Sequence, residues 1–154
     1  MKAAVVHANE DVRYEEIMEP SVTPGSVKIK IAVSGICGSD VPRVLHHGVH
    51  FYPIVLGHEF AGVVVETGEG VQEVKVGDHV TGAPLLPCMK CEDCQNGNYS
   101  LCRHYSFIGS REQGSNAEYL VIPEKNVVVL DKQVSFDKGA MVEPATVAIH
   151  GLIQ

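Results

Sequence analysis

Four of the five cysteines lie in one short stretch, "PCMKCEDCQNGNYSLC" (87–102), and this cluster limits the possible folds more than any other feature. The spacing is C-x2-C-x2-C-x7-C, formed by Cys88, Cys91, Cys94 and Cys102. Gly97 and Asn98 let the chain fold back within the longest gap. Four thiolates at about 2.3 Å complete a tetrahedral zinc site and leave no open position. We therefore predict a lobe built on a structural zinc ion.

An iron–sulfur cluster is the main alternative to zinc. Bacterial ferredoxins use the run C-x2-C-x2-C-x3-C-P. Here the last gap is seven residues, and Arg103 rather than proline follows the final cysteine. Four unrelated buried thiols would be a third explanation, and the regular spacing argues against it. Zinc is favoured.

The composition describes an ordinary globular domain of 154 residues, with 45% hydrophobic and 20% charged residues. The net charge of -7 argues against a nucleic-acid partner. The start of the chain lacks the pattern of a signal peptide, and no apolar run approaches the length of a membrane span. We therefore expect a cytoplasmic protein, in a compartment where clustered cysteines bind metal more often than they form disulfides.

A hydrophobic period of two dominates the chain. In "SVKIKIAV" (26–33), valine and isoleucine alternate with lysine or small residues, which is typical of a half-buried strand. Further strands are predicted at 60–68, 79–82, 117–122 and 126–130. Many short strands separated by turns indicate an antiparallel barrel or sandwich. The segment from Ser135 onward is predicted to be helical, with Ser135 as N-cap and a break near Pro144.

The fifth cysteine, Cys37, follows the clearest predicted strand, and taken alone it could be a small core residue. His58 and Glu59 precede another strand, and Glu143 lies at the predicted helix break. A cysteine, a histidine and a carboxylate form a zinc set with one position open for water or substrate. Adjacent strand residues point to opposite faces, so His58 and Glu59 could not both be ligands without a local distortion. Spacing alone leaves open whether these segments meet.

Several segments, taken in order, resemble the zinc-dependent medium-chain alcohol and polyol dehydrogenases, and the resemblance covers essentially the whole chain. The segments are "CGSD" (37–40), "PIVLGHEFAGVVVETGEGV" (53–71), "VGDHV" (76–80), the four-cysteine lobe and "AEYLVIPEKNVVVLD" (117–131). A finer likeness to dehydrogenases of hexitol phosphates rests on "CGSDVPRVLHHGVHFYPIVLGHEF" (37–60), "PLLPC" (84–88), "YSFIGSR" (105–111) and "VEPATVAIHG" (142–151).

The resemblance implies a fold and two zinc ions. The fold would be mainly β: a chaperonin-10-like, partly open β-barrel over residues 1–154, with the zinc lobe at 87–102 and a C-terminal helical segment. The lobe cysteines would hold the structural zinc. Cys37, His58 and Glu143 would hold a catalytic zinc, with Glu59 as an alternating or outer ligand.

The same resemblance implies a reaction. Zinc would bind a secondary hydroxyl of a polyol or polyol phosphate and lower its pKa, and NAD would accept hydride from the carbon. Ser39 occupies the position of the family's relay hydroxyl, although taken alone it reads equally well as a turn residue. Several relatives carry a histidine three residues later, where this chain has Pro42, so the exit of the proton is open. His46, His47 and His50 lie nearby in sequence, and nothing in the sequence assigns them this role.

Four residues are candidates for contact with the substrate. Arg43 and Arg111 could hold a phosphate, because a guanidinium offers a planar fork of donors, or could be ordinary solvated charges. Tyr52 and Phe107 could line the pocket by analogy with relatives, or simply pack at the rim of the sheet.

No G-x-G-x-x-G turn is present, so the nucleotide-binding domain of the family is expected to lie outside this chain. The resemblance implies that the longer parent protein is a homo-oligomer. Two other functions stay open: a zinc-binding fragment without catalysis, and a plain sorbitol-, alcohol- or threonine-type dehydrogenase domain.

Overall fold

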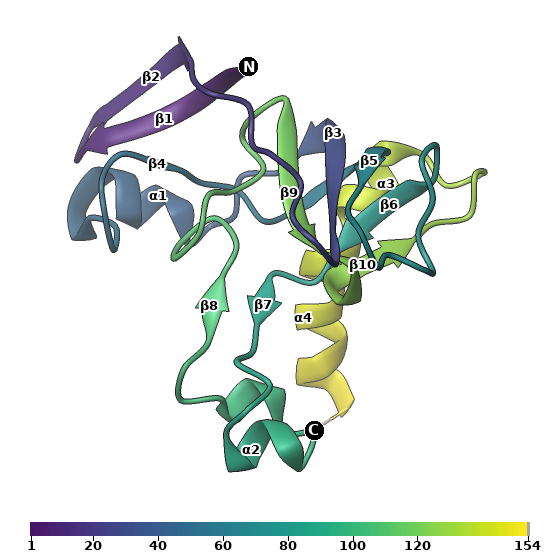
Figure 1. Cartoon of the computed structure of the whole chain (residues 1–154). Helices are drawn as coiled ribbons and strands as arrows, with labels where there is room; N and C mark the ends of the chain where they lie inside the picture. Colours follow the sequence, from purple (N-terminus) through teal and green to yellow (C-terminus); the bar gives the residue numbers. More distant parts are fainter. Residues whose placement is uncertain (154) are drawn as a thin grey trace.

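The structure is a computed structural model and describes residues 1–153. Short strands dominate, and the longest helix, α4, closes the described part of the chain (Figure 1). The strands are β1 (Lys2–Ala8), β2 (Asp11–Glu16), β3 (Ser26–Ser34), β4 (Ile54–Val55), β5 (Phe60–Thr67), β6 (His79–Gly82), β7 (Leu85–Leu86), β8 (Ser106–Phe107), β9 (Tyr119–Pro123) and β10 (Val127–Val129). The helical segments are α1 (Asp40–Pro42), η1 (Arg43–His47), α2 (Glu92–Gln95), η2 (Tyr99–Leu101), η3 (Glu124–Asn126), α3 (Phe136–Ala140) and α4 (Val142–Ile153).

The main sheet has five antiparallel strands in the order β10-β6-β5-β3-β9. Its two central strands, β3 and β5, pair from Val27↔Thr67 to Ser34↔Phe60. One face of this sheet carries the core, in which Ile29, Phe60 and Val64 are fully buried. Burying a side chain of this size contributes about 1.5–3 kcal/mol. The strands predicted from the period of two are confirmed at this sheet.

Lys28 departs from the simple alternation of β3. It lies on the polar face, yet it is only 9% exposed. Its Nζ contacts Glu19 at 3.0 Å and Glu66, its cross-strand neighbour, at 2.8 Å. The hydrogen bond that Lys28 donates to Glu66, followed by the one it donates to Glu19, raises the pKa of Lys28 above its usual value. The charge is buried because two carboxylates pair with it.

A second sheet has the order β2-β1-β4, and its β1–β2 hairpin was not among the predicted strands. In β1 the apolar residues Val5 and Val6 are adjacent rather than alternating, and both are buried. The strand β2 has only one apolar aliphatic residue, Val12, and the connecting turn holds Glu10 at φ 63° in place of a glycine. The period-of-two signal therefore fails at this hairpin.

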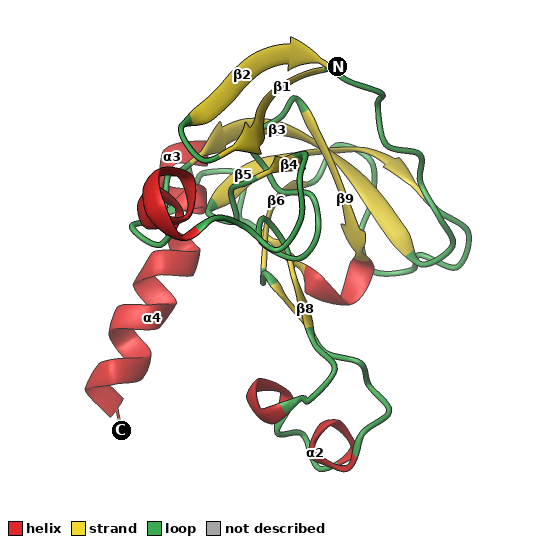
Figure 2. Cartoon of the chain, turned by 90° about the vertical axis from the view of Figure 1, so that its left-hand side faces the viewer, coloured by secondary structure: helices red, strands yellow, loops and turns green. Residues whose placement is uncertain are grey.

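The third sheet is a two-stranded ribbon, β7–β8, that carries the cysteine lobe away from the main body (Figures 1 and 2). The predicted mainly-β class, with a lobe and a C-terminal helical segment, is confirmed. The three sheets are not closed into a barrel.

The first C-terminal helix begins as predicted, whereas the second begins at Val142, before the predicted start at Pro144. The Oγ of Ser135 accepts a hydrogen bond from the N–H of Lys138 at 3.5 Å and caps α3. The break falls at Met141, and Pro144 lies in the first turn of α4, where the missing N–H costs little. Helix α4 projects from the body in the same direction as the lobe (Figures 1 and 2). Among residues 1–153, no helix combines the length and apolarity that a membrane span requires.

Candidate functional site

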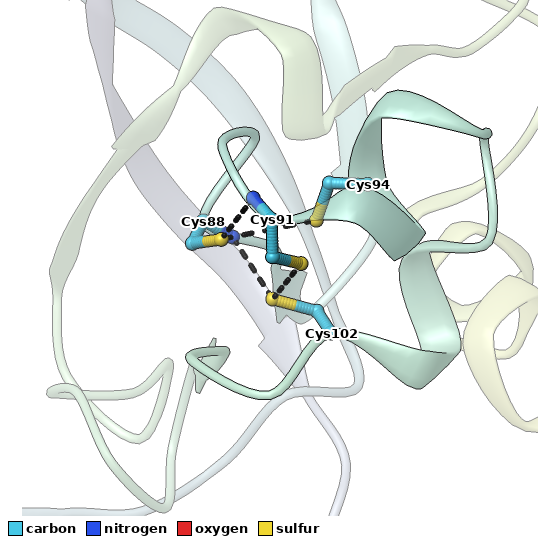
Figure 3. Close-up of side chains that lie close together, drawn as sticks. All are labelled: Cys88, Cys91, Cys94 and Cys102. Carbon is cyan, nitrogen blue, oxygen red and sulfur yellow. Dashed lines mark hydrogen bonds between the residues drawn. The ribbon is translucent and has the colours of Figure 1, made fainter.

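The sulfur atoms of the lobe cysteines converge on one point (Figure 3). All four lie within 4.8 Å of one another, and the Cys88–Cys94 and Cys91–Cys102 pairs are each 3.9 Å apart. Sulfurs placed tetrahedrally at about 2.3 Å from zinc are separated by about 3.8 Å. A disulfide would require about 2.05 Å, and all four thiols are free. The donor set and its dimensions fit a tetrahedral zinc ion.

Backbone amides stabilise the negatively charged thiolate form of cysteine that a zinc site needs. The N–H groups of Lys90 and Cys91 donate to the Sγ of Cys88 at 3.5 and 3.4 Å, and they lower the pKa of Cys88 to about 6. Burial acts in the opposite direction on Cys94 and raises its pKa to about 12. A thiol with so high a pKa keeps its proton at neutral pH unless a metal ion replaces it.

Cys37, His58 and Glu59 form a second group, with one ligand atom from each within 4.8 Å of the others. Cys37 follows β3, and the other two precede β5. These strands are neighbours, and Ser34 pairs with Phe60 where β3 ends and β5 begins. The backbone also joins the two loops, since the N–H of Gly35 donates to the carbonyl of Glu59 at 2.6 Å. The main sheet therefore brings residues 37 and 58–59 together.

Gly57 lies in the irregular segment that leads to His58 and Glu59. Residues 56–59 are not in a strand, and Gly57 has φ +98°, a conformation that other residues rarely adopt. A Cβ at this position would collide with the side chains of Ser115 and Asn116. The segment that holds the two neighbouring candidate ligands therefore departs from regular strand geometry, so strict alternation of side chains does not apply to it.

The donor chemistry of this second group fits zinc. His58 is 4% exposed, and its buried Nδ1 has no hydrogen-bond partner among the described residues. A buried polar atom without a partner is costly, and metal coordination through Nδ1 would remove that cost. A thiolate, an imidazole and a carboxylate also leave a fourth position open, as catalytic zinc sites do.

Glu143, in the first turn of α4, lies outside this group of three. It is close enough to respond to the group's charges. Burial raises the pKa of Glu143, the charge of His58 opposes the rise, and the charge of Glu59 adds to it. Of the two predicted carboxylate ligands, the structure thus gathers Glu59 with Cys37 and His58 and leaves Glu143 nearby.

Ser39 and Arg43 adjoin the group. The Ser39 hydroxyl donates to the Sγ of Cys37 at 3.2 Å. The Nη1 of Arg43 lies 3.1 Å from the Ser39 Oγ and 3.0 Å from the buried Oδ1 of Asp40. Asp40 is part of the "CGSD" motif, but the sequence assigned it no role. The sequence shows that an acidic residue stands at this position, and only the fold shows that it is buried.

The remaining predicted residues have varied surroundings. Phe107 contacts the ring of His58, with centroids 5.4 Å apart. The guanidinium of Arg111 lies over the ring of Tyr105, 4.8 Å from its centroid. Tyr52 is 41% exposed, and its hydroxyl donates to Asn9 at 2.7 Å. The side chains of His46, His47 and His50 are exposed and belong to neither group of candidate metal ligands within residues 1–153.

Comparison with known proteins identifies the class. Residues 23–132 match the alcohol dehydrogenase GroES-like domain, and the chain belongs to this family. The chain is 46% identical to galactitol 1-phosphate 5-dehydrogenase of Escherichia coli (strain K12), over 97% of this chain and 44% of that protein. A crystal structure of the Escherichia coli galactitol-1-phosphate dehydrogenase superimposes with a TM-score of 0.94, at 46% identity, and covers 97% of this chain and 44% of the other.

A second relative acts on a different alcohol. The chain is 37% identical to (R,R)-butanediol dehydrogenase of Bacillus subtilis (strain 168), over 99% of this chain and 46% of that protein. The chain therefore spans less than half the length of these curated relatives. Family membership is shown at the level of an alcohol and polyol dehydrogenase domain, and the two relatives differ in the substrate that their names give.

Proposed function

We propose that this chain is the zinc-binding catalytic portion of an NAD-dependent dehydrogenase that oxidises a secondary hydroxyl of a polyol or hexitol phosphate. The observation that carries the proposal is the convergence of Cys37, His58 and Glu59 at the ends of β3 and β5. The lobe would hold a second, structural zinc ion. All five cysteines are free thiols, which suits a reducing cytoplasm.

Each of these residues would have a distinct role in the site. Cys37, His58 and either Glu59 or Glu143 would hold the catalytic zinc. When bound, zinc would make a substrate hydroxyl more acidic, and NAD would accept the hydride. Ser39, whose Oγ contacts Cys37, is placed to orient that hydroxyl by a hydrogen bond. Phe107 packs edge-on against the ring of His58 and would help to hold that ring in place.

The finer proposal, a phosphorylated hexitol, draws support from the 46% identity with galactitol 1-phosphate 5-dehydrogenase. Of the two candidate phosphate ligands, Arg111 is the more available. Its contact is with the face of Tyr105, whereas Arg43 is already paired with the buried Asp40. Charge-assisted bonds to a guanidinium contribute more than neutral ones, about 1.5–3 kcal/mol each.

Substrate choice in the full-length parent protein tests this proposal. Steady-state kinetics with NAD would compare galactitol 1-phosphate, galactitol and 2,3-butanediol as substrates. Arg111→Ala should lower kcat/KM about 10-fold to 100-fold for the phosphorylated substrate and leave the others nearly unchanged. Arg13→Ala, which removes an arginine from an exposed ion pair on β2, is the matched control.

Each alternative has its own outcome in this assay. Equal losses on all substrates would reject the phosphate contact and leave a plain polyol dehydrogenase. If the parent protein with both sites metal-loaded oxidised none of these alcohols, the dehydrogenase proposal itself would fail, and a zinc-binding module without catalysis would replace it.

A further inference from the structure

A directed chain of hydrogen bonds ends on the Cys37 sulfur. It begins at Asp40, which is 3% exposed and whose Oδ1 lies 3.0 Å from the Nη1 of Arg43. The same Nη1 donates to the Ser39 Oγ at 3.1 Å, and the Ser39 hydroxyl donates to the Cys37 Sγ at 3.2 Å. Four side chains within seven consecutive residues thus connect a buried carboxylate to a candidate metal ligand.

The direction of this chain follows from arginine chemistry. A guanidinium only donates hydrogen bonds and keeps its protons throughout the physiological range. The Ser39 Oγ must therefore accept from Arg43, and its own hydrogen is left for Cys37. Pro42, one residue before Arg43, offers no side-chain acceptor. Within this network Ser39 has no partner that could take a proton outward.

We infer that Arg43 is a positioning residue of the site, which fixes the Ser39 hydroxyl so that it donates to the Cys37 sulfur. The inference rests on the proposed role of Cys37 as a metal ligand. A hydrogen bond to a ligand sulfur withdraws electron density from it and changes how it binds the metal. Arg43 would thus tune the metal site through Ser39, a role distinct from the phosphate contact considered above.

Asp40 makes Arg43 suitable for this role. The ion pair neutralises the guanidinium and holds it in place, and it links residues three apart across the junction of α1 and η1. A buried carboxylate that is paired and hydrogen-bonded resists reorientation. The position of Nη1, and through it that of the Ser39 Oγ, is therefore set by a side chain with little freedom to move.

The spectrum of a cobalt-substituted chain tests the inference. The protein is first given one equivalent of zinc, to fill the four-thiolate lobe, and then one equivalent of Co²⁺. Cys37 is then the only thiolate that can bind cobalt, so the thiolate-to-cobalt charge-transfer band reports on that sulfur. Losing the Ser39 donor makes the sulfur more electron-rich, so Ser39→Ala should move the band to longer wavelength. Arg43→Ala should move it in the same direction.

A double-mutant cycle separates action through Ser39 from a general structural effect. In the Ser39→Ala background, Arg43→Ala should cause no further shift. With Ser39 present, Arg43→Lys, which keeps the pair with Asp40, should leave the band closer to its original position than Arg43→Ala does. Arg13→Ala removes an arginine from another Arg–Asp pair and should leave the band unchanged. Zinc retained in the lobe shows that each variant is folded. Ser39→Ala keeps the Arg43–Asp40 pair intact. Its band shift therefore tests the hydrogen bond to Cys37 even if Arg43→Ala fails to fold.

Two results would overturn the inference. An Arg43→Ala band that coincides with that of the Arg13→Ala control would show that Arg43 does not act on Cys37. A shift that persists in full in the Ser39→Ala background would show that Arg43 acts by another route. If Cys37 is not a metal ligand at all, the result differs from both of these. The charge-transfer band would then be absent from the parent chain, and Cys37→Ser would change nothing.

Discussion

The ring of Phe107 meets the ring of His58 edge-on, with the ring planes at 75°. Phe107 ends β8, the strand by which the chain returns from the cysteine lobe, and His58 belongs to the group of candidate catalytic ligands. The β7–β8 ribbon that carries the lobe therefore contacts the second group of candidate ligands through this pair of side chains.

This contact predicts that Phe107→Ala weakens the site at Cys37 while the lobe keeps its metal. An aromatic pair of this kind contributes about 0.5–1.5 kcal/mol beyond the area it buries, and its loss frees the His58 ring. Urea unfolding of the zinc-loaded chain should show the lower stability, and chelator competition should show the weaker second zinc. Phe51→Ala, at a phenylalanine that is 39% exposed, is the control. Equal metal affinity in both variants would contradict the prediction.

The convergence of four sulfurs in the lobe leads to a prediction for Cys91→Ser. The substitution removes one of four converging sulfurs, so the chain should lose one zinc ion and the 87–102 segment should become sensitive to proteolysis. Cys37, His58 and Glu59 should still bind their ion. Elemental analysis of the purified variant measures this directly, with Cys37→Ser as its counterpart. Full occupancy of both sites in Cys91→Ser would refute the assignment of the lobe.

We predict that Gly57→Ala destabilises the chain more than the addition of one methyl group would suggest. Gly57→Ala must accept φ +98° and also place a Cβ against Ser115 and Asn116. Gly70→Ala is a matched control, because Gly70 has φ +83° but open space where a Cβ would lie. The positive φ alone costs about 1–2 kcal/mol, so the control should lose roughly that much.

The additional loss in Gly57→Ala should appear both in the unfolding free energy and in zinc binding at the adjacent His58. Similar stabilities for the two variants, with full metal content in each, would show that the segment before β5 relaxes around the new side chain.

How far the sequence predicts this fold depends on the range of the contacts involved. The cysteine lobe could be predicted because its ligands lie within one short segment. The strand β3 could be predicted because alternate residues enter a single core. Spacing alone could not predict the approach of His58 and Glu59 to one site, because these residues lie in an irregular segment that includes Gly57 at φ +98°. A segment distant in sequence also contacts Gly57, because the N–H of Ser115 donates to the Gly57 carbonyl at 2.9 Å.

Glu124 provides a pH-dependent prediction outside both candidate metal sites. Its Oε1 accepts the backbone N–H groups of Gln72, Glu73 and Val74 at 2.9, 2.6 and 3.2 Å. These bonds, the one from Glu73 foremost, hold the pKa of Glu124 below its usual 4.5. The carboxylate thus ties the start of η3 to the connection between β5 and β6.

Because the folded-state pKa is lower than the unfolded value, ionised Glu124 stabilises the fold above about pH 4.5, and this contribution is lost as the pH falls through the folded pKa. Glu124→Gln keeps an acceptor oxygen but cannot ionise. It should unfold at a lower temperature than the parent chain at pH 7, and the gap should narrow as the pH falls below 4.5. Thermal unfolding at matched pH measures the gap, with Glu69→Gln, at an exposed glutamate nearby, as control. A gap that stays constant down to pH 3 would show that the charge of Glu124 does not stabilise the fold.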